Sequence, residues 1–259
     1  MDIGLIGSGA IGQYLLKKIN KENHPALNIK NILVRNREKY QSLESEYDIK
    51  LFTDIDEFLS SDIDMVVEAA NVQTVQSVLP DVLKKKDVML ISVGALVDEE
   101  LLSETVRLTE DYGHQLHLPS GAIGGLDLIQ NAKSHGNLNS VQLTTRKPAA
   151  SLTDEEIHEE QIVFEGKAVE AIEKFPKNMN VSIILSLAGL GINHTDVRLI
   201  ADPAADKNIH HIKLSGDFGE AELTIKNEPL PENPKTSTLA ALSILGTLER
   251  IQSNIKYGN

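Results

Sequence analysis

The chain has 259 residues, of which 41% are hydrophobic and 4% are aromatic, so we expect one or two domains with a mainly aliphatic core. The formal net charge of −13 argues against a nucleic-acid partner, because phosphates are neutralised by clustered lysine and arginine. The lack of cysteine in the sequence excludes disulfides, thiolate metal sites and any enzyme that works through a thiohemiacetal.

The sequence contains no run of about 18 apolar residues that would span a bilayer. It also lacks a basic segment followed by an apolar one ahead of the first predicted strand, so we expect a cytoplasmic protein without a membrane partner. Acidic residues are concentrated between 154 and 160. We interpret them as a solvated surface rather than a carboxylate metal cluster, and no metal site is predicted.

A glycine-rich turn follows the first predicted strand. Gly7, Gly9 and Gly12 match the pattern G-x-G-x-x-G between an apolar run and an amphipathic segment. In this context Gly7 permits the tight turn, Gly9 lets the backbone approach a pyrophosphate, and Gly12 lets helix and strand pack closely. The helix that starts with Ala10 and Ile11 turns its N-terminus toward the phosphates. The segment therefore predicts a dinucleotide-binding site.

Short aliphatic strands alternate with helical stretches as far as about residue 115, which indicates a parallel sheet wound by helices. The further strands of this sheet are predicted at 29–34, 65–70 and 88–93. Helices are predicted at 72–86 and 98–113, where Gly113 suits a C-terminal cap. The first half of the chain therefore reads as an α/β Rossmann domain.

The end of the second predicted strand carries no acidic residue. NAD-specific folds place a carboxylate here, which accepts a hydrogen bond from the 2′-hydroxyl of the adenosine ribose. In this chain the positions hold Arg35, Asn36 and Arg37. Asn36 is able to bind a hydroxyl without repelling a 2′-phosphate, and the arginines either pair with that phosphate or lie exposed. We therefore expect NADP to be accepted alongside NAD.

The pattern changes at residue 118. From there to about 232 the strands alternate polar and apolar residues, look antiparallel and indicate an α+β substrate domain; they are predicted at 141–147, 196–201, 209–215 and 221–226. Asn233-Pro234 is expected to end the last strand, before an amphipathic helix at 236–255 that returns to the first domain. The inward side chains of this helix are predicted to be Leu239, Leu242, Leu245, Leu248 and Ile251.

These patterns divide the chain into two domains. Residues 1–117 and 235–259 are assigned to the dinucleotide-binding Rossmann domain. Residues 118–234 are assigned to the α+β domain, which is expected to bind the substrate, to carry the catalytic residue and to form the dimer.

His210 differs from the other histidines in its predicted placement. Strand alternation puts it on the face of Ile212 and Leu214, and it puts His211 on the opposite face. An imidazole with a pKa of about 6.5 is a natural proton shuttle, although a hydrogen-bonded core histidine fits the same pattern. Asp202, which precedes a proline, either orients this ring or only forms a turn.

Two segments of the second half offer groups that bind anions. Residues 120–125 (Ser-Gly-Ala-Ile-Gly-Gly) present successive backbone N–H groups at a predicted helix start, as a cradle for an anion or a nicotinamide. Lys235, Thr236 and Ser237 offer a cation and two hydroxyls, which suit a carboxylate. An ordinary capped helix is the alternative for both segments.

Four segments, taken in order, resemble the L-aspartate dehydrogenase family: Pro119–Asp127, Phe175–Val181, Ala201–Pro203 with Asn208–His210, and Asn233–Ser237. The resemblance covers essentially the whole chain. It implies a homodimer whose subunits combine a Rossmann domain with an α+β domain similar to that of dihydrodipicolinate reductase. It also implies oxidation of L-aspartate with NAD or NADP to iminoaspartate, which hydrolyses to oxaloacetate and ammonia or supplies NAD biosynthesis.

The resemblance also implies roles for single residues. His210 is expected to be the catalytic acid/base, and Ala122 and Asn180 are expected to bind the cofactor. On this basis we expect the two carboxylates of aspartate to be held by Lys235, Thr236 and Ser237. A related dehydrogenase of another small amino or hydroxy acid, and a cofactor-binding regulator without turnover, are the alternatives.

Overall fold

The computed structural model describes residues 1–134, 136–153, 155–176 and 179–257, with the exception of the side chain of Lys235. The chain divides into two compact units. Unit 1 comprises Met1–Pro119 and Ala241–Lys256, and unit 2 comprises Ser120–Ala240 and Tyr257. Within the described residues, no helix has both the length and the apolar character needed to cross a membrane.

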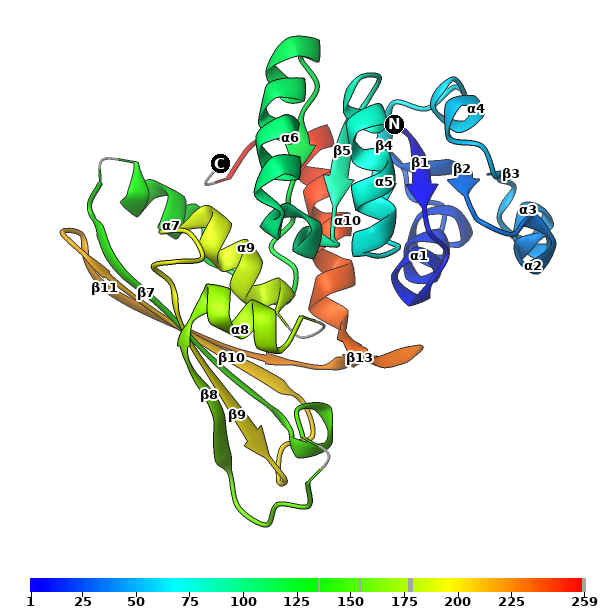
Figure 1. The fold of residues 1–259 in the computed structure, drawn as a ribbon. Coiled ribbons are helices and arrows are strands. Elements are labelled where there is room, and N and C mark those ends of the chain that lie inside the picture. The colour runs from blue at the N-terminus through cyan, green and yellow to red at the C-terminus, as the bar shows by residue number, and fades with distance from the viewer. Residues whose placement is uncertain (135, 154, 177–178, 258–259) are drawn as a thin grey trace. The chain divides into compact units, whose positions relative to one another are not determined.

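Unit 1 is built on a parallel sheet with the strand order β3-β2-β1-β4-β5-β6 (Figure 1). The strands are β1 (Asp2–Ile6), β2 (Asn28–Leu33), β3 (Lys50–Phe52), β4 (Met65–Glu68), β5 (Asp87–Leu90) and β6 (Leu116–His117). This order defines the doubly wound dinucleotide-binding fold, in which ligands bind beyond the carboxyl ends of the strands where the order reverses. The reversal lies between β1 and β4, so a ligand is expected beyond residues 6 and 68.

Helices cover both faces of this sheet. The helices of the unit are α1 (Ala10–Leu16) with its π-helical continuation η1 (Lys17–Lys21), α2 (Arg37–Tyr40), α3 (Ser42–Tyr47), α4 (Ile55–Leu59), α5 (Val72–Leu83), η2 (Val93–Val97), α6 (Glu99–Tyr112) and most of α10 (Thr238–Gln252). Ile244 and Leu248 of α10 are buried with Leu15 of α1 and Leu5 of β1 in one core cluster. The C-terminal helix therefore returns to the Rossmann unit, as predicted.

Unit 2 is built on a mixed sheet with the strand order β11-β10-β7-β9-β8. The strands are β7 (Leu138–Pro148), β8 (Gln161–Lys167), β9 (Asp196–Asp202), β10 (Asn208–Gly216) and β11 (Gly219–Asn227). The expectation of antiparallel strands is wrong for one pair, because β7 and β9 run parallel, with Gln142 opposite Asp196. A parallel pair needs a long crossover, and here β8 and several helical segments lie in it.

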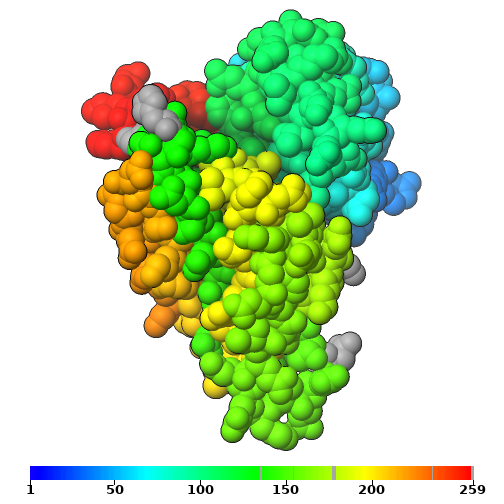
Figure 2. Space-filling view, turned by 60° about the vertical axis from the view of Figure 1, so that its left-hand side comes forward, coloured from blue at the N-terminus to red at the C-terminus, as the bar shows by residue number. Residues whose placement is uncertain are grey.

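The helices α7 (Leu126–Lys133), α8 (Ala168–Lys174) and α9 (Asn180–Ala188) lie along one face of this sheet (Figure 1). Val141 and Leu143 of β7 and Ile212 and Leu214 of β10 are buried on that covered face. The alternate residues of both strands are less buried. The short helix η3 (Ala149–Ser151) follows β7, and the segment of β8 and α8, yellow-green in Figure 2, lies at the surface.

The start of the C-terminal helix differs from the prediction. Asn233–Ser237 is not a helix cap but the strand β13, which pairs with β12 (Pro229–Leu230), and α10 begins at Thr238. A proline is tolerated in such a short ribbon because there its missing N–H breaks no central ladder.

The predicted inward face of α10 is partly wrong, because Leu242 is 43% exposed. Steps of three residues drift by about 60° around a helix, since each residue turns about 100°. The buried face instead follows Ala241, Ile244 and Leu248.

Candidate cofactor and catalytic sites

The glycine turn lies directly after β1, as predicted. Gly7 has a φ of +99°, and a Cβ on it would lie 2.8 Å from the Cβ of Ala70. A Cβ on Gly12 would lie 2.6 Å from the carbonyl oxygen of Gly7. Both positions therefore need glycine for the backbone itself.

Gly9 has a different surrounding. It is the N-cap of α1, makes no side-chain cap, and none of the described atoms lies within 4 Å of a Cβ built on it. The first N–H groups of the helix, which include those of Ala10 and Ile11, therefore donate no hydrogen bond to a side chain of the cap. Such a turn fits a pyrophosphate, because a ligand is able to approach the backbone closely and to accept hydrogen bonds from it.

A cavity of about 550 Å³ opens at this turn. The turn residues Gly7 and Gly9, the end of β2 with Arg35, and Ala70 and Asn71 after β4 contribute to its lining. Dinucleotide folds hold the pyrophosphate and the adenosine ribose at these two places, the turn after the first strand and the end of the second. The cavity therefore matches the adenosine half of a dinucleotide in position.

Of the three residues after Val34, all of which the structure describes, only Arg35 lines this cavity. Its guanidinium Nη2 donates to the hydroxyl of Thr74 at 3.1 Å. The side-chain oxygen of Asn36 instead accepts from the backbone N–H of Lys39 at 3.1 Å and caps α2. Arg37 pairs with Glu44. Arg35 is thus the residue of this group whose side chain is placed to contact a ligand in the cavity.

Glu68, at the end of β4, is a buried carboxylate that the sequence analysis missed. It accepts hydrogen bonds from the N–H of Ala70 at 2.7 Å and from the hydroxyl of Ser92 at 2.8 Å, and its burial raises its pKa. These bonds fix the segment after β4 that lines the cavity. The sequence feature that could have revealed Glu68 is its position as the single charged residue at the end of an otherwise apolar strand.

In unit 2, His210 is 3% exposed and lies on the covered face of the sheet, as alternation predicts. Its Nδ1 is hydrogen-bonded to the hydroxyl of Thr145, at 2.9 Å, in the register position directly opposite on β7. Burial, assisted by the positive charge of Lys147, lowers the pKa of His210 to about 3. The imidazole is therefore neutral at physiological pH.

Asp202 does not orient this ring. One of its carboxylate oxygens accepts from Arg146 at 2.7 Å, and the other accepts from the N–H of Ala204 at 2.8 Å. Of the two roles left open for Asp202, the structure therefore shows the turn. The side chain that holds the His210 ring is Thr145, which the sequence analysis did not single out.

Asn227 joins the two predicted anion-binding segments of unit 2. Its Nδ2 donates to the carbonyl oxygen of Ala122 at 3.0 Å, and its Oδ1 accepts from the hydroxyl of Ser237 at 2.5 Å. Thr236 accepts a hydrogen bond from the side chain of Asn233. The structure thus brings the loop of Ala122 next to β13, and Asn227 is a further residue that the sequence analysis missed.

The remaining sequence-predicted positions are less informative. Asn180 is exposed at the first turn of α9. The side chain of Lys235 lies outside the described residues, as do Asp154 of the acidic run and Lys177 and Asn178 of the second family motif. The described part of the chain holds no cluster of three histidine or acidic side chains placed to bind a metal ion.

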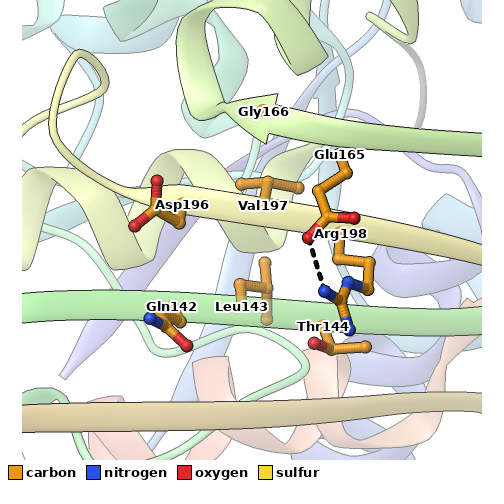
Figure 3. A pocket seen from close by; sticks show the side chains of 8 residues that line it. All are labelled: Gln142, Leu143, Thr144, Glu165, Gly166, Asp196, Val197 and Arg198. Atoms are coloured by element: carbon orange, nitrogen blue, oxygen red, sulfur yellow. Dashed lines mark hydrogen bonds and ion pairs between the residues drawn. The ribbon is translucent and has the colours of Figure 1, made fainter.

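A second cavity, of about 360 Å³, lies over β7, β8 and β9 (Figure 3). Gln142 and Thr144 of β7 line this cavity. Figure 3 shows the ion pair between Glu165 of β8 and Arg198 of β9, which also line it. Gln142 and Thr144 alternate with the buried residues of β7, so this cavity lies on the sheet face opposite His210. It is therefore separate from the candidate catalytic site.

Comparison with known proteins assigns a family to each half of the chain. Residues 7–119 match the family described as homoserine dehydrogenase, NAD binding domain, and residues 127–251 match aspartate dehydrogenase, C-terminal. The whole chain is 39% identical to L-aspartate dehydrogenase of Methanosarcina barkeri, covering 99% of that protein, and 39% identical to that of Methanopyrus kandleri, covering 98%. The crystal structure of aspartate dehydrogenase from Thermotoga maritima matches with a TM-score of 0.82 at 29% identity over 99% of both chains. The resemblance inferred from four motifs is thus confirmed, and this chain belongs to the aspartate dehydrogenase family.

Proposed function

We propose that this chain is an NAD(P)-dependent L-aspartate dehydrogenase, which oxidises L-aspartate to iminoaspartate that hydrolyses to oxaloacetate and ammonia. The observation that carries the proposal is the 39% identity, over the full length, to proteins named for this activity. The open glycine turn of unit 1 and the buried neutral imidazole of unit 2 support it, because the reaction needs a dinucleotide and a base.

The residues of unit 1 fit the cofactor. Gly7, Gly9 and Gly12 form the turn, and the N–H groups of Ala10 and Ile11 at the start of α1 would hold the pyrophosphate. Arg35 or Asn36 would contact the adenosine ribose. In unit 2, Ala122 and Asn180 are assigned to the cofactor by the family resemblance. Bound NAD or NADP supplies one chemical property, which is to accept the hydride from Cα of the substrate.

His210 is assigned the acid/base role. When Nδ1–H donates to Thr145, the lone pair of Nε2 is free to take a proton. His210 then removes a proton from the water that attacks the carbon of the protonated imine, and it gives that proton to the nitrogen of the resulting carbinolamine. As ammonia leaves, His210 takes the remaining hydroxyl proton and the carbonyl of oxaloacetate forms. A ring that was already protonated would have no lone pair for the first step. The lowered pKa therefore keeps the ring in the neutral form that this first step needs.

Lys235, Thr236 and Ser237 are proposed to bind the carboxylates of aspartate. The backbone of all three residues belongs to β13, which Ser237 ties through Asn227 to the loop of Ala122. This arrangement supports the proposal because it brings β13 close to a segment assigned to the cofactor.

We further infer that two copies associate through unit 2, that the enzyme acts in the cytoplasm, and that its iminoaspartate supplies NAD biosynthesis. The support for the dimer is exposed apolar surface. Ile162 of the edge strand β8 is 56% exposed and Phe218 is 42% exposed, both in unit 2.

Reductive amination tests the proposed reaction. Oxaloacetate, ammonium and either NADH or NADPH are mixed with the enzyme, and consumption of the reduced cofactor is followed by its absorbance. Ammonium-dependent consumption is expected. Consumption without ammonium would instead indicate a hydroxy-acid dehydrogenase, and tight cofactor binding without turnover would indicate a regulator. His210→Ala is the matched variant, and it is expected to lose about 10²-fold or more in rate.

A further inference from the structure

A lysine lies within the covered face of the unit 2 sheet. Along β7, Leu143, Thr145 and Lys147 are buried, whereas Thr144 and Arg146 between them are partly exposed. Because side chains alternate along a strand, Lys147 points to the same side as the covering helices. It is 9% exposed, although lysine is almost never fully buried unless its charge is paired.

Lys147 is a close neighbour of His210. In the antiparallel register, Thr145 lies opposite His210, and Lys147 follows Thr145 by two residues on the same face. Such diagonal neighbours lie about 7–8 Å apart, within reach of a long side chain. The positive charge of Lys147 contributes to the lowered pKa of His210, which agrees with this proximity. On its other side Lys147 lies opposite Ala201 of β9 in the parallel register.

The pair combines a cation with a neutral base. Burial lowers the pKa of Lys147 to about 8, so the ammonium form still predominates at pH 7. An ammonium group in a poorly solvated place attracts a carboxylate strongly, because little water competes for either charge. The neighbouring imidazole offers no charge of its own at this pH. An anion that enters this place is therefore expected to take Lys147 as its partner.

We propose that Lys147 binds a carboxylate of the dicarboxylic substrate and thereby places the substrate beside His210. The inference rests on the proposed function, since it concerns the substrate of the same site. It adds a second cation to the proposed Lys235, so that each carboxylate of a four-carbon dicarboxylate has one ammonium partner.

The test compares Lys147→Met, which keeps the length of the side chain and removes its charge, with wild type. In reductive amination the KM for oxaloacetate is expected to rise about tenfold or more. The inhibition constant of succinate, a four-carbon dicarboxylate that cannot react, is expected to rise to a similar degree. Lys147→Arg should recover part of both losses, because it keeps a cation.

Lys213→Met is the matched control. Lys213 lies in the same sheet on the opposite face of β10, where it pairs with Glu222 at 3.2 Å. Both constants should stay within about twofold of wild type in this variant. The dissociation constant of NADPH, which reports on unit 1, should stay the same in every variant.

A labelling experiment on wild type covers the case in which Lys147→Met does not fold. Reductive methylation with formaldehyde is followed by mass spectrometry with and without succinate. Protection of Lys147 but not of Lys213 is expected, and equal labelling of Lys147 in both samples would overturn the proposal. Unchanged constants in Lys147→Met would overturn it too, while the proposed function stands. If wild type shows no turnover but succinate binding depends on Lys147, the proposed function fails and the carboxylate site holds.

Discussion

At the scale of single residues, Arg35 is expected to govern the choice between the two cofactors. Its guanidinium lines the cofactor cavity at the end of β2, where a 2′-phosphate would lie. Arg35→Ala is expected to weaken NADPH binding by about tenfold and NADH binding by less than about threefold, since only NADPH offers the extra phosphate. Fluorescence titration with each reduced cofactor measures the two dissociation constants.

Arg37→Ala provides the control for this prediction. Arg37 pairs with Glu44 and does not line the cavity, so its removal should leave both affinities unchanged. An equal loss for NADH and NADPH in Arg35→Ala would show that Arg35 does not contact the 2′-position.

The buried imidazole of His210 links stability to pH. Its folded-state pKa of about 3 lies below the ordinary value of 6.5, so the unfolded chain binds more protons between these values. The free energy of unfolding contributed by this group is fully present above pH 6.5 and is lost as the pH falls toward about 3, by up to about 1.4 kcal/mol per pH unit.

The variant His210→Gln removes this titration. Urea unfolding at about pH 7, 6 and 5 should show a smaller loss of stability on acidification in the variant than in wild type. Two parallel curves would mean that the imidazole titrates normally in the folded protein.

The direction of the His210 side chain was predictable, because it depends only on alternation along one strand. Its partner Thr145 was not, since the pairing of β7 with β10 joins residues 65 positions apart in sequence. Asp202 attracted notice because it precedes a proline close to His210 in sequence, yet its nearest charge is Arg146. Short sequence patterns report local geometry, whereas the neighbours of a buried side chain depend on strand register.

At the scale of elements, substitutions in the glycine turn separate two requirements: close packing of α1 at Gly12, and approach of the pyrophosphate at Gly9. A methyl group on Gly12 meets the carbonyl oxygen of Gly7 at 2.6 Å, so Gly12→Ala is expected to displace α1 and to cost about 1–3 kcal/mol of stability. Gly9→Ala meets none of the described atoms and should leave stability within about 1 kcal/mol of wild type. Urea unfolding measures both.

Cofactor binding should respond differently in these two variants. Gly9→Ala places its methyl group where the pyrophosphate approaches the backbone, so NADPH affinity is expected to fall by about tenfold or more despite normal stability. If Gly9→Ala binds NADPH like wild type, the turn does not hold the phosphates as proposed.

The strands and helices that were predicted in unit 1 lie close to those observed, because buried parallel strands and amphipathic helices have strong and different periods. The short elements β3, β6 and α2 to α4 were not predicted. Gly113 caps α6 as expected, with a φ of +74°, and at the other end the side chain of Asp98 caps the helix. In unit 2 alternation located β7, β9 and β10 but gave no information on their relative direction, so the parallel pair of β7 with β9 was missed. Asn233–Ser237 was missed as a strand because its proline and hydroxyls resemble a helix start.

At the scale of the whole molecule, the family resemblance predicts a homodimer, and the exposed edge strand β8 of unit 2 is the proposed interface. Light scattering on wild type is expected to give twice the subunit mass of 28.4 kDa. Ile162→Glu places a charge on the exposed edge strand β8 and should shift the equilibrium toward the monomer. Val106→Glu, on α6 of unit 1, is the control, because Val106 is similarly exposed at 51%. A monomeric wild type would contradict the prediction.

The position of α10 also fixes the order in which the protein is completed during synthesis. The ribosome makes the strands of unit 1 first, but the core cluster of Leu5 and Leu15 also needs Ile244 and Leu248, which emerge after residues 120–240 of unit 2. Unit 2 is therefore an insertion in unit 1, and residues 120–240 are able to fold before the last helix of unit 1 has been synthesised. A nascent chain interrupted before residue 241 would leave the apolar side of its first strand uncovered, and it would be a natural target for chaperones and proteases.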